Sequence, residues 1–339
     1  MLMSATGGAK DRLGSRNFLD GIWGAVPTPF RADGGLDLSG VESNARRFHR
    51  DVGLDGVFCN GLIGEQWSLT LAERKLILES VLAGADRAMK VGVVVSAQCL
   101  ADTLDLARHA SRAGAHHIVL MRPAGLTQDD DVERYIGAVA AASDVAVVVF
   151  DGGVQTGGLS PASLSRLAVQ GKIHGVKCTR GGDVAEALRA VCAADIPIVD
   201  PYESHWLSNL LRFDLRALYA DPEPYLFQLP DRRPIAAYFS AYVAGDLGGA
   251  ARLFRELEPI RALYYRWIMA PLQAGRPVNA VLKRWFGHMG FAAGPVRAPL
   301  APLSDEQARR FDAELIAAFE QVYGADFVFP AMDGMAWKS

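Results

Sequence analysis

Residues 173–182 read Ile-His-Gly-Val-Lys-Cys-Thr-Arg-Gly-Gly, and this segment shows the pattern that decides the fold. The apolar run that ends at Lys177 is typical of a short buried strand, and the glycines after it predict a turn. The amphipathic stretch Asp183–Ala193 that follows predicts a helix. Seven units of this kind can be counted before residue 200. Strict alternation of strand and helix indicates parallel strands with crossover helices.

The predicted strands are short apolar runs, and the predicted helices are longer amphipathic stretches. We expect strands at Gly21–Val26, Asp55–Cys59, Val91–Ser96, His117–Met121, Ala146–Phe150, Ile173–Lys177 and Ile196–Val199. We expect helices at Leu38–Val52, Thr70–Ala83, Ala101–Ala113, Asp130–Ala142, Ser160–Val169 and Asp183–Ala193. Thr70 and Glu73 form a capping-box pattern at the start of the second helix. An eighth strand has two candidates, Ala217–Ala220 and Tyr225–Leu229.

Eight such units that close on themselves form a TIM (β/α)8 barrel, and this is the α/β fold that we predict. An open doubly wound sheet is the alternative, but no Gly-x-Gly-x-x-Gly motif follows the first strand. After the barrel the pattern is helical, at Ile235–Ala244, Ala250–Met269, Val278–Met289 and Asp305–Val322. We therefore expect a flexible N-terminal tail over 1–17, the barrel over 18–232, a C-terminal helical domain over 233–325 and a C-terminal tail over 326–339.

The composition narrows the classes of function. The chain has 339 residues, of which half are hydrophobic, and a formal net charge of -3. This near-neutral balance argues against a nucleic-acid or anionic-membrane partner. No apolar run reaches the ~18 residues that a membrane span needs. The four cysteines show no Cys-x-x-Cys spacing and are typical of reduced thiols in a cytoplasmic protein, and residues 1–16 contain no apolar secretion signal.

Lys177 is the strongest candidate for a catalytic residue. The chemistry of a TIM barrel takes place at the C-terminal ends of the strands, and Lys177 ends the sixth predicted strand. Burial disfavours an ammonium ion, and a neutral amine can attack a ketone and form a Schiff base. The alternative is a structural lysine whose stem lies along apolar surface while the ammonium group reaches water. The position at the barrel mouth favours the reactive amine.

Five short motifs occur in order along the chain: Gly24–Phe30, Gly61–Glu65, Leu71–Arg74, Gly175–Lys177 and Arg297–Leu300. With these motifs, over roughly residues 20 to 320, the chain resembles the dihydrodipicolinate synthase/N-acetylneuraminate lyase superfamily of class I aldolases. The resemblance implies a TIM barrel with a C-terminal helical domain. It also implies that Lys177 forms a Schiff base with a 2-oxo acid, commonly pyruvate.

The chain departs from the pattern of this superfamily at several polar positions. The superfamily has a proton-shuttling tyrosine at the end of strand five, where this chain has Phe150. It also has two hydroxyl residues in the turn after strand two, where this chain has Leu62 and Ile63. The arginine that binds a distal carboxylate in the synthase aligns with Gln155. We therefore do not expect dihydrodipicolinate synthase itself. The apolar replacements favour a partner substrate that is apolar or aromatic, because unpaired polar groups are costly to bury.

The expected substrate-binding residues lie around the turn after strand two. Backbone N–H groups of a tight turn can bind a carboxylate whatever the side chains are, whereas the other interpretation is that the glycines serve only tight backbone geometry. We interpret Glu65 as a carboxylate that braces this turn. The predicted substrate-binding residues are Gly61, Leu62, Ile63, Gly64, Phe150 and Thr28.

Because Phe150 cannot carry a proton, another group must do so. The candidates by strand-end position are Asp151, Tyr202, Glu203 and His205. His205 could titrate near neutral pH, although a histidine that starts a helix and faces solvent is at least as common. We expect no metal site, because His116, His117 and His288 lack ligands at suitable spacing, and no cofactor.

The sequence thus predicts a Schiff-base lyase, an aldolase, hydratase-aldolase or dehydratase that acts on a 2-oxo acid such as pyruvate or its aldol adduct. The alternative is a catalytically altered member of the superfamily that binds a small oxo acid or has a structural or regulatory role. We expect a homodimer or homotetramer, with no nucleic-acid or membrane partner. The aromatic tail from Phe327 to Trp337 offers apolar surface for such an assembly.

Overall fold

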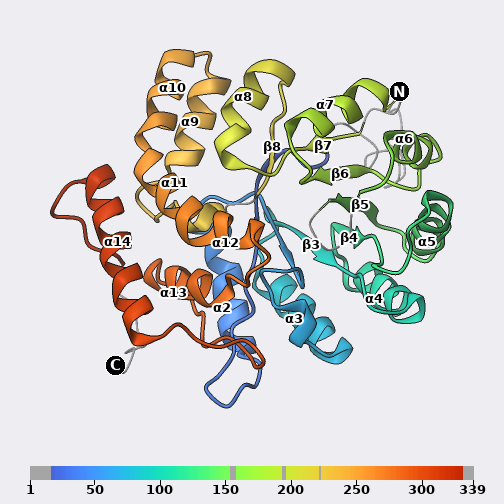
Figure 1. Cartoon of the computed structure of the whole chain (residues 1–339), viewed down its shortest axis with the longest axis horizontal. Helices are drawn as coiled ribbons and strands as arrows, with labels where there is room; N and C mark the ends of the chain where they lie inside the picture. Colours follow the sequence, from blue (N-terminus) through green and yellow to red (C-terminus); the bar gives the residue numbers. More distant parts are fainter. Residues whose placement is uncertain (1–16, 153–157, 193–195, 221–222, 331–339) are drawn as a thin grey trace, which may run out of the picture.

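Eight parallel strands surrounded by helices form the centre of the molecule (Figure 1). The computed structural model describes residues 17–152, 158–192, 196–220 and 223–330. The strands run in the order β7-β6-β5-β4-β3-β2-β1-β8, so β1 pairs with both β2 and β8. Within the described residues no ladder joins the two-residue β7 to β8, which leaves the barrel nearly closed. The strands are β1 (Gly21–Ala25), β2 (Gly56–Cys59), β3 (Lys90–Val94), β4 (His117–Met121), β5 (Ala146–Asp151), β6 (Gly175–Cys178), β7 (Ile198–Val199) and β8 (Ala217–Tyr219).

The predicted barrel is confirmed, and the ambiguity about the eighth strand is resolved. β8 is the first of the two candidates, and residues 224–226 form a 3₁₀ turn instead of a strand. The crossover helices are α2 (Leu38–Arg50), α3 (Leu71–Gly84), α4 (Leu100–Ala113), α5 (Asp129–Ala141), α6 (Pro161–Val169), α7 (Gly182–Val191) and α8 (Glu203–Phe213). The capping box at Thr70 and Glu73 is present, and Ser160 caps α6 with Pro161 in its first turn. Such caps satisfy N–H groups that a helix start would leave without partners.

The chain after the barrel is helical, but the second of its predicted helices is divided. It comprises α10 (Leu247–Glu256), α11 (Glu258–Tyr264) and a π-helical turn at Tyr265–Met269, because Pro259 cannot continue the hydrogen-bond ladder of α10. The other helices are α9 (Pro234–Val243), α12 (Ala270–Gln273), α13 (Asn279–His288) and α14 (Asp305–Tyr323). Within the described ranges, no helix combines the length and the apolar character that crossing a membrane requires.

The start of the predicted C-terminal tail packs on α14. The ring of Phe319 lies 5.3 Å from that of Phe327 and 4.8 Å from that of Phe329. These two rings are therefore partly buried within their own chain, whereas Val328 between them is 82% exposed. Residues 331–339 and 1–16, which hold the rest of both predicted tails, lie outside the described residues.

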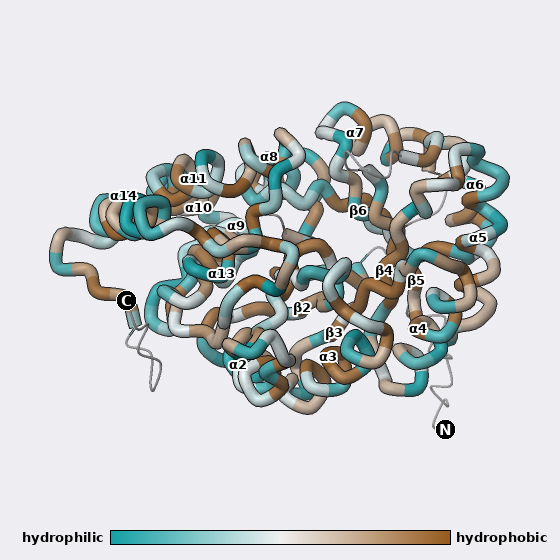
Figure 2. Tube along the Cα trace, turned by 60° about the horizontal axis from the view of Figure 1, so that its bottom comes forward, coloured by the Kyte–Doolittle hydropathy of each residue, from teal (hydrophilic) through white to brown (hydrophobic). Residues whose placement is uncertain are grey.

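The barrel interior holds large side chains because glycines on neighbouring strands make room for them. Trp23 of β1 lies opposite Gly56 of β2, where an added Cβ atom would stand 2.3 Å from the indole ring. His117 of β4 lies opposite Gly92 of β3, where a Cβ atom would stand 2.4 Å from the imidazole. Figure 2 shows hydrophobic residues gathered in the strands and hydrophilic residues on the outer helices. These large side chains fill the interior of the barrel below the candidate site.

Candidate active site

Lys177 lies inside the barrel, surrounded by aromatic rings. It belongs to β6, and only 3 % of its surface is exposed. Its Nζ atom lies 5.0 Å from the ring centre of Phe58, 5.3 Å from that of Phe150 and 5.7 Å from that of Tyr219. We call these three rings, which come from β2, β5 and β8, the aromatic box. The amine therefore stands in a confined, mostly apolar space, which is the environment that a Schiff-base lysine requires.

The strand register explains why these rings meet. Alternate strands of a (β/α)8 barrel contribute side chains to the same interior layer. Phe58, Lys177 and Tyr219 come from the even-numbered strands β2, β6 and β8, whereas Phe150 comes from β5 and lies directly opposite Lys177 in the ladder. Sequence reasoning missed Phe58 and Tyr219. Their inward positions follow from strand parity, but only once the eighth strand and the register are known.

A polar chain runs through the core beside the aromatic box. The hydroxyl of Tyr219 lies 2.6 Å from Nε2 of His117, and Nδ1 of His117 lies 3.0 Å from Nδ1 of His116. Burial raises the pKa of Tyr219 well above its ordinary value and lowers that of His117 well below it. Burial also lowers the pKa of His116 to about 4. All three groups are therefore neutral near pH 7.

The turn Gly61–Glu65 after β2 is held from behind by its carbonyl groups. Asn279 of α13 donates from Nδ2 to the carbonyls of Leu62 and Ile63, at 3.0 and 3.2 Å. The Gly61 carbonyl accepts from the N–H of Gln66, and the Gly64 carbonyl accepts from the hydroxyl of the buried Thr28 at 2.8 Å. Within the part of the chain that the structure describes, the N–H groups of Leu62 and Ile63 donate to no protein acceptor. These two donors are available for an anionic group.

Buried charges lock this turn to the helical part of the chain. Glu65 is fully buried and adopts a positive φ of 56°, which a non-glycine residue takes only when its surroundings impose it. Its Oε1 lies 2.6 Å from Nζ of Lys283 on α13, and its Oε2 accepts from the N–H of Arg297 at 3.0 Å. The Arg297 guanidinium in turn pairs with Glu73 of α3 at 2.8 Å. Three of the sequence motifs therefore meet here, and Glu65 occupies the bracing role that we expected.

Asp151 lies in an ion pair beside the site. Its carboxylate accepts from Nε of Arg180 at 2.9 Å and from the N–H of Leu159 at 2.9 Å, and the side chain is fully buried. Burial raises the pKa of Asp151, against the opposing effect of Arg180. Arg122, which directly follows β4, donates to the carbonyls of Leu126 and Gly158 and not to Asp151. Arg180, three residues after Lys177, was missed. Gln155 lies outside the described residues.

The acid–base candidates after β7 have different surroundings. Glu203 is fully buried, accepts from Arg261 of α11 at 2.7 Å and from the hydroxyl of Tyr238 at 2.9 Å, and thereby joins α8 to the helical region. Both oxygens of the Glu203 carboxylate are therefore engaged by partners from the helical region. His205 is half-exposed, and its Nδ1 lies 2.9 Å from Oδ2 of the buried Asp200. Asp200 is the partner that sequence reasoning did not assign.

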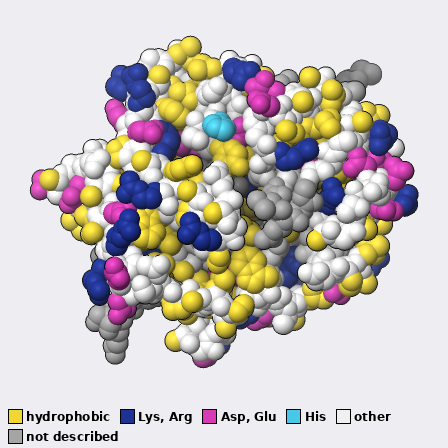
Figure 3. All heavy atoms as spheres, viewed as in Figure 1, with side chains coloured by type: hydrophobic (Ala, Val, Ile, Leu, Met, Phe, Trp, Pro, Cys, Tyr) yellow, Lys and Arg dark blue, Asp and Glu magenta, His cyan; other side chains and the backbone are white. Residues whose placement is uncertain are grey.

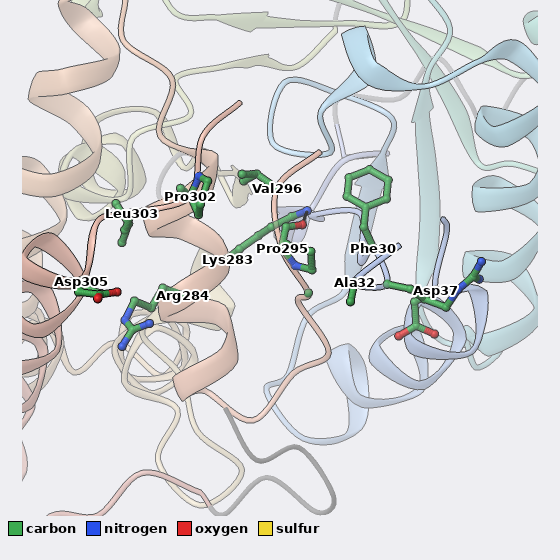
Figure 4. A pocket seen from close by; sticks show the side chains of 14 residues that line it. Phe30, Ala32, Asp37, Lys283, Arg284, Pro295, Val296, Pro302, Leu303 and Asp305 are labelled. Carbon is green, nitrogen blue, oxygen red and sulfur yellow. Dashed lines mark hydrogen bonds between the residues drawn. The ribbon is translucent and has the colours of Figure 1, made fainter. Parts of the chain in front are cut away.

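A cavity of about 590 Å³ lies elsewhere, between the loop after β1 and the helices α13 and α14. In Figure 4 the Lys283 side chain extends toward Pro295 and Phe30, while Arg284 and Asp305 lie on the other side. Lys177 and the aromatic box do not line this cavity. Burial lowers the pKa of Lys283 to about 8, although Glu65 opposes the shift.

The face of the molecule seen in Figure 3 carries interspersed positive and negative side chains.

Comparison with known proteins relates this geometry to one family. The model of the Dihydrodipicolinate synthetase family matches residues 18–211. The 4-hydroxy-tetrahydrodipicolinate synthase of Acidothermus cellulolyticus is 30% identical over 303 residues, which cover 87% of this chain and 91% of that protein. The 4-hydroxy-tetrahydrodipicolinate synthase 1 of Streptomyces coelicolor is 30% identical over 313 residues, covering 88% and 92%.

Solved structures share the fold. YagE of Escherichia coli K12, a prophage protein of the dihydrodipicolinic acid synthase family in complex with pyruvate, superposes with a TM-score of 0.73 at 24% identity, covering 88% of this chain and 98% of that one. N-acetylneuraminate lyase from Mycoplasma synoviae superposes with a TM-score of 0.73 at 17% identity, covering 89% and 98%. At these identities the likeness concerns the fold alone.

Proposed function

This chain belongs to the dihydrodipicolinate synthetase family, and on that premise we propose that Lys177 forms a Schiff base with the keto group of pyruvate or a related 2-oxo acid. The chain is a lyase of the class I aldolase type. The observation that carries the proposal is the position of the Lys177 amine, buried inside the barrel on β6 and enclosed by the aromatic box.

The proposed chemistry uses two parts of the site. The amine of Lys177 attacks the keto carbon after it has given up its proton, and the keto oxygen leaves as water with one proton taken from solvent, so that a protonated imine forms. The N–H groups of Leu62 and Ile63 bind the substrate carboxylate, because the carbonyls of the turn are held by Asn279 and Thr28 on its other side. Thr28 supports the turn through its hydrogen bond to the Gly64 carbonyl.

We further propose that the partner substrate is apolar or aromatic. Phe58, Phe150 and the half-buried Leu62 surround the amine or the carboxylate turn with apolar groups. A polyhydroxylated sugar acid would leave several hydroxyl groups without partners there, at about 1–3 kcal/mol each. We expect condensation of pyruvate with benzaldehyde-like aldehydes to exceed that with aspartate semialdehyde. Equal or better use of aspartate semialdehyde would contradict this assignment of the partner.

Reductive trapping tests the nucleophile. The protein is incubated with pyruvate and sodium borohydride, and its intact mass and peptide map are measured. We expect one adduct on the peptide that carries Lys177, and none in Lys177→Met. Lys172→Met, which removes a more exposed lysine just before the same strand, is the matched control and should keep the adduct. An adduct that persists in folded Lys177→Met would exclude Lys177, and an untrapped wild type would favour the catalytically altered alternative.

A further inference from the structure

Asp200 and His205 form a carboxylate–imidazole pair at the C-terminal end of β7. Nδ1 of His205 lies 2.9 Å from Oδ2 of Asp200, and the other oxygen of Asp200 accepts from the N–H of Tyr202 at 3.2 Å. A carboxylate only accepts hydrogen bonds, so Nδ1 carries the proton and Nε2 of the neutral ring is a proton acceptor. Asp200 is buried, whereas half of the His205 side chain is exposed. The pair therefore presents an oriented base at the rim of the barrel.

The strand that carries this pair is the neighbour of the strand that carries Lys177. Val199, the residue before Asp200, lies directly opposite Lys177 in the β6–β7 ladder. Tyr202 connects the two sides, since its ring meets the His205 ring edge-on at 5.4 Å and its hydroxyl donates to the carbonyl of Thr179 at 3.4 Å. His205 is thus linked through one side chain to a residue two positions beyond Lys177.

Two of the other candidates for proton transfer, Asp151 and Glu203, are engaged elsewhere. The carboxylate of Asp151 pairs with Arg180, and that of Glu203 pairs with Arg261; both are fully buried. The hydroxyl of Tyr219 points to His117 in the core. Phe150 has no exchangeable proton at the position beside Lys177. Among these groups, His205 alone combines an oriented acceptor nitrogen with access from solvent.

We propose that His205, oriented by Asp200, removes and returns the proton at C3 of the 2-oxo acid held on Lys177. The inference rests on the proposed Schiff base at Lys177. In this step the C3–H electron pair becomes the C2=C3 bond, and the imine π pair moves to nitrogen, giving a neutral enamine. The proton passes to Nε2 of His205, and the step reverses when carbon takes a proton back. Asp200 is a positioning residue, since it fixes the ring and stabilises the imidazolium that forms.

The electrostatic setting supports this role. The hydrogen bond from Asp200 raises the pKa of His205 above its ordinary value, and partial burial opposes the rise. A raised pKa makes the unprotonated Nε2 nitrogen of His205 a stronger base.

Hydrogen exchange at C3 of pyruvate tests the proposal on the full-length protein. Pyruvate is incubated in D₂O, and loss of its methyl ¹H signal is followed by NMR, with the uncatalysed rate subtracted. Borohydride trapping on the same samples measures Schiff-base formation. We expect both His205→Gln and Asp200→Asn to form the borohydride-trapped adduct. The rate of exchange at C3 should fall by about 100-fold or more in His205→Gln. His205→Ala should regain exchange when imidazole is added to the solution.

A matched control comes from the helical region, where His288 pairs with Asp312 at 2.9 Å in a similar carboxylate–imidazole contact. His288→Gln should keep both adduct and exchange. If His205→Gln forms the adduct and exchanges C3 within about threefold of wild type, the proposal is wrong, although the Schiff base at Lys177 stands. If wild type forms no adduct, the proposed function fails and this inference fails with it. Loss of exchange in Tyr202→Phe but not in His205→Gln would assign the proton to the tyrosine instead and overturn the proposal.

Discussion

At the scale of single residues, the hydroxyl of Tyr219 has one partner that matters for stability, Nε2 of His117. Tyr219→Phe keeps the ring in the aromatic box but leaves the fully buried His117 without this partner. A buried polar group that loses its hydrogen bond costs about 1–3 kcal/mol. We expect the free energy of unfolding, measured by urea denaturation, to fall by that amount. Tyr265→Phe, at a side chain that is 57% exposed, should change it by less than about 0.5 kcal/mol; equal effects of the two substitutions would contradict the assignment.

The buried histidine pair predicts sensitivity to acid. Burial lowers the pKa of His116 to about 4 and that of His117 well below its ordinary value, whereas both return toward about 6.5 when the chain unfolds. Between these values the unfolded chain binds more protons than the folded chain. The stability that the neutral histidines contribute is therefore present above about pH 6.5 and is lost as the pH falls toward 4.

His116→Gln isolates this contribution. The difference in unfolding free energy between His116→Gln and wild type should shift in favour of the variant by on the order of 1–2 kcal/mol from pH 7 to pH 5. Chemical denaturation at both pH values measures it. A difference that is independent of pH would show that His116 does not titrate in this way.

At the scale of the elements, the turn after β2 depends on α13. Lys283→Met removes the cation beside Glu65 and, among the described residues, leaves this fully buried carboxylate with the Arg297 N–H as its one remaining partner. Breaking a buried ion pair on one side costs about 3–5 kcal/mol. We expect that loss in urea unfolding, together with weaker pyruvate trapping, because the turn would no longer be fixed. Lys75→Met breaks the more exposed pair with Asp105 and should cost at most about 1 kcal/mol. A small effect of Lys283→Met on both measurements would refute this role of the pair.

The elements also show how far the sequence could be interpreted. Strand and helix positions were predicted to within a few residues, because alternating apolar runs and caps are local signals. Pro259 is a local signal for the division of a helix, although we predict one continuous helix over Ala250–Met269. By contrast, the meeting of Phe58 and Tyr219 around Lys177, the pairing of Asp151 with Arg180 and the pairing of Glu203 with Arg261 depend on register and tertiary packing. No spacing along the chain encodes these distances, so the acid–base candidates could be named but not separated.

At the scale of the whole molecule, we propose a homodimer or homotetramer. Three large apolar side chains on the connections that follow β2 and β3 are each at least 40% exposed: Trp67, Leu76 and Leu100. Exposed apolar groups from neighbouring units are typical of an interface. Light scattering after size exclusion should give twice or four times 36.5 kDa. Trp67→Glu should lower that mass, while Val243→Glu, in the helical region, should not; a wild-type monomer would contradict the proposal.

Contacts between the barrel and the C-terminal helical region decide whether the barrel could function by itself. Arg261 of α11 pairs with Glu203, Asn279 of α13 bonds to the turn after β2, and Arg297 pairs with Glu73. A fragment that stops after β8 would keep every strand yet lose Asn279, Lys283 and Arg261, and Glu65 and Glu203 would lose the cations that balance their charges. We therefore expect that the barrel cannot function without the C-terminal helices. A chimera that grafts this barrel onto the helices of a relative should fold and work only if the donor supplies an amide and three cations at the places of Asn279, Lys283, Arg261 and Arg297.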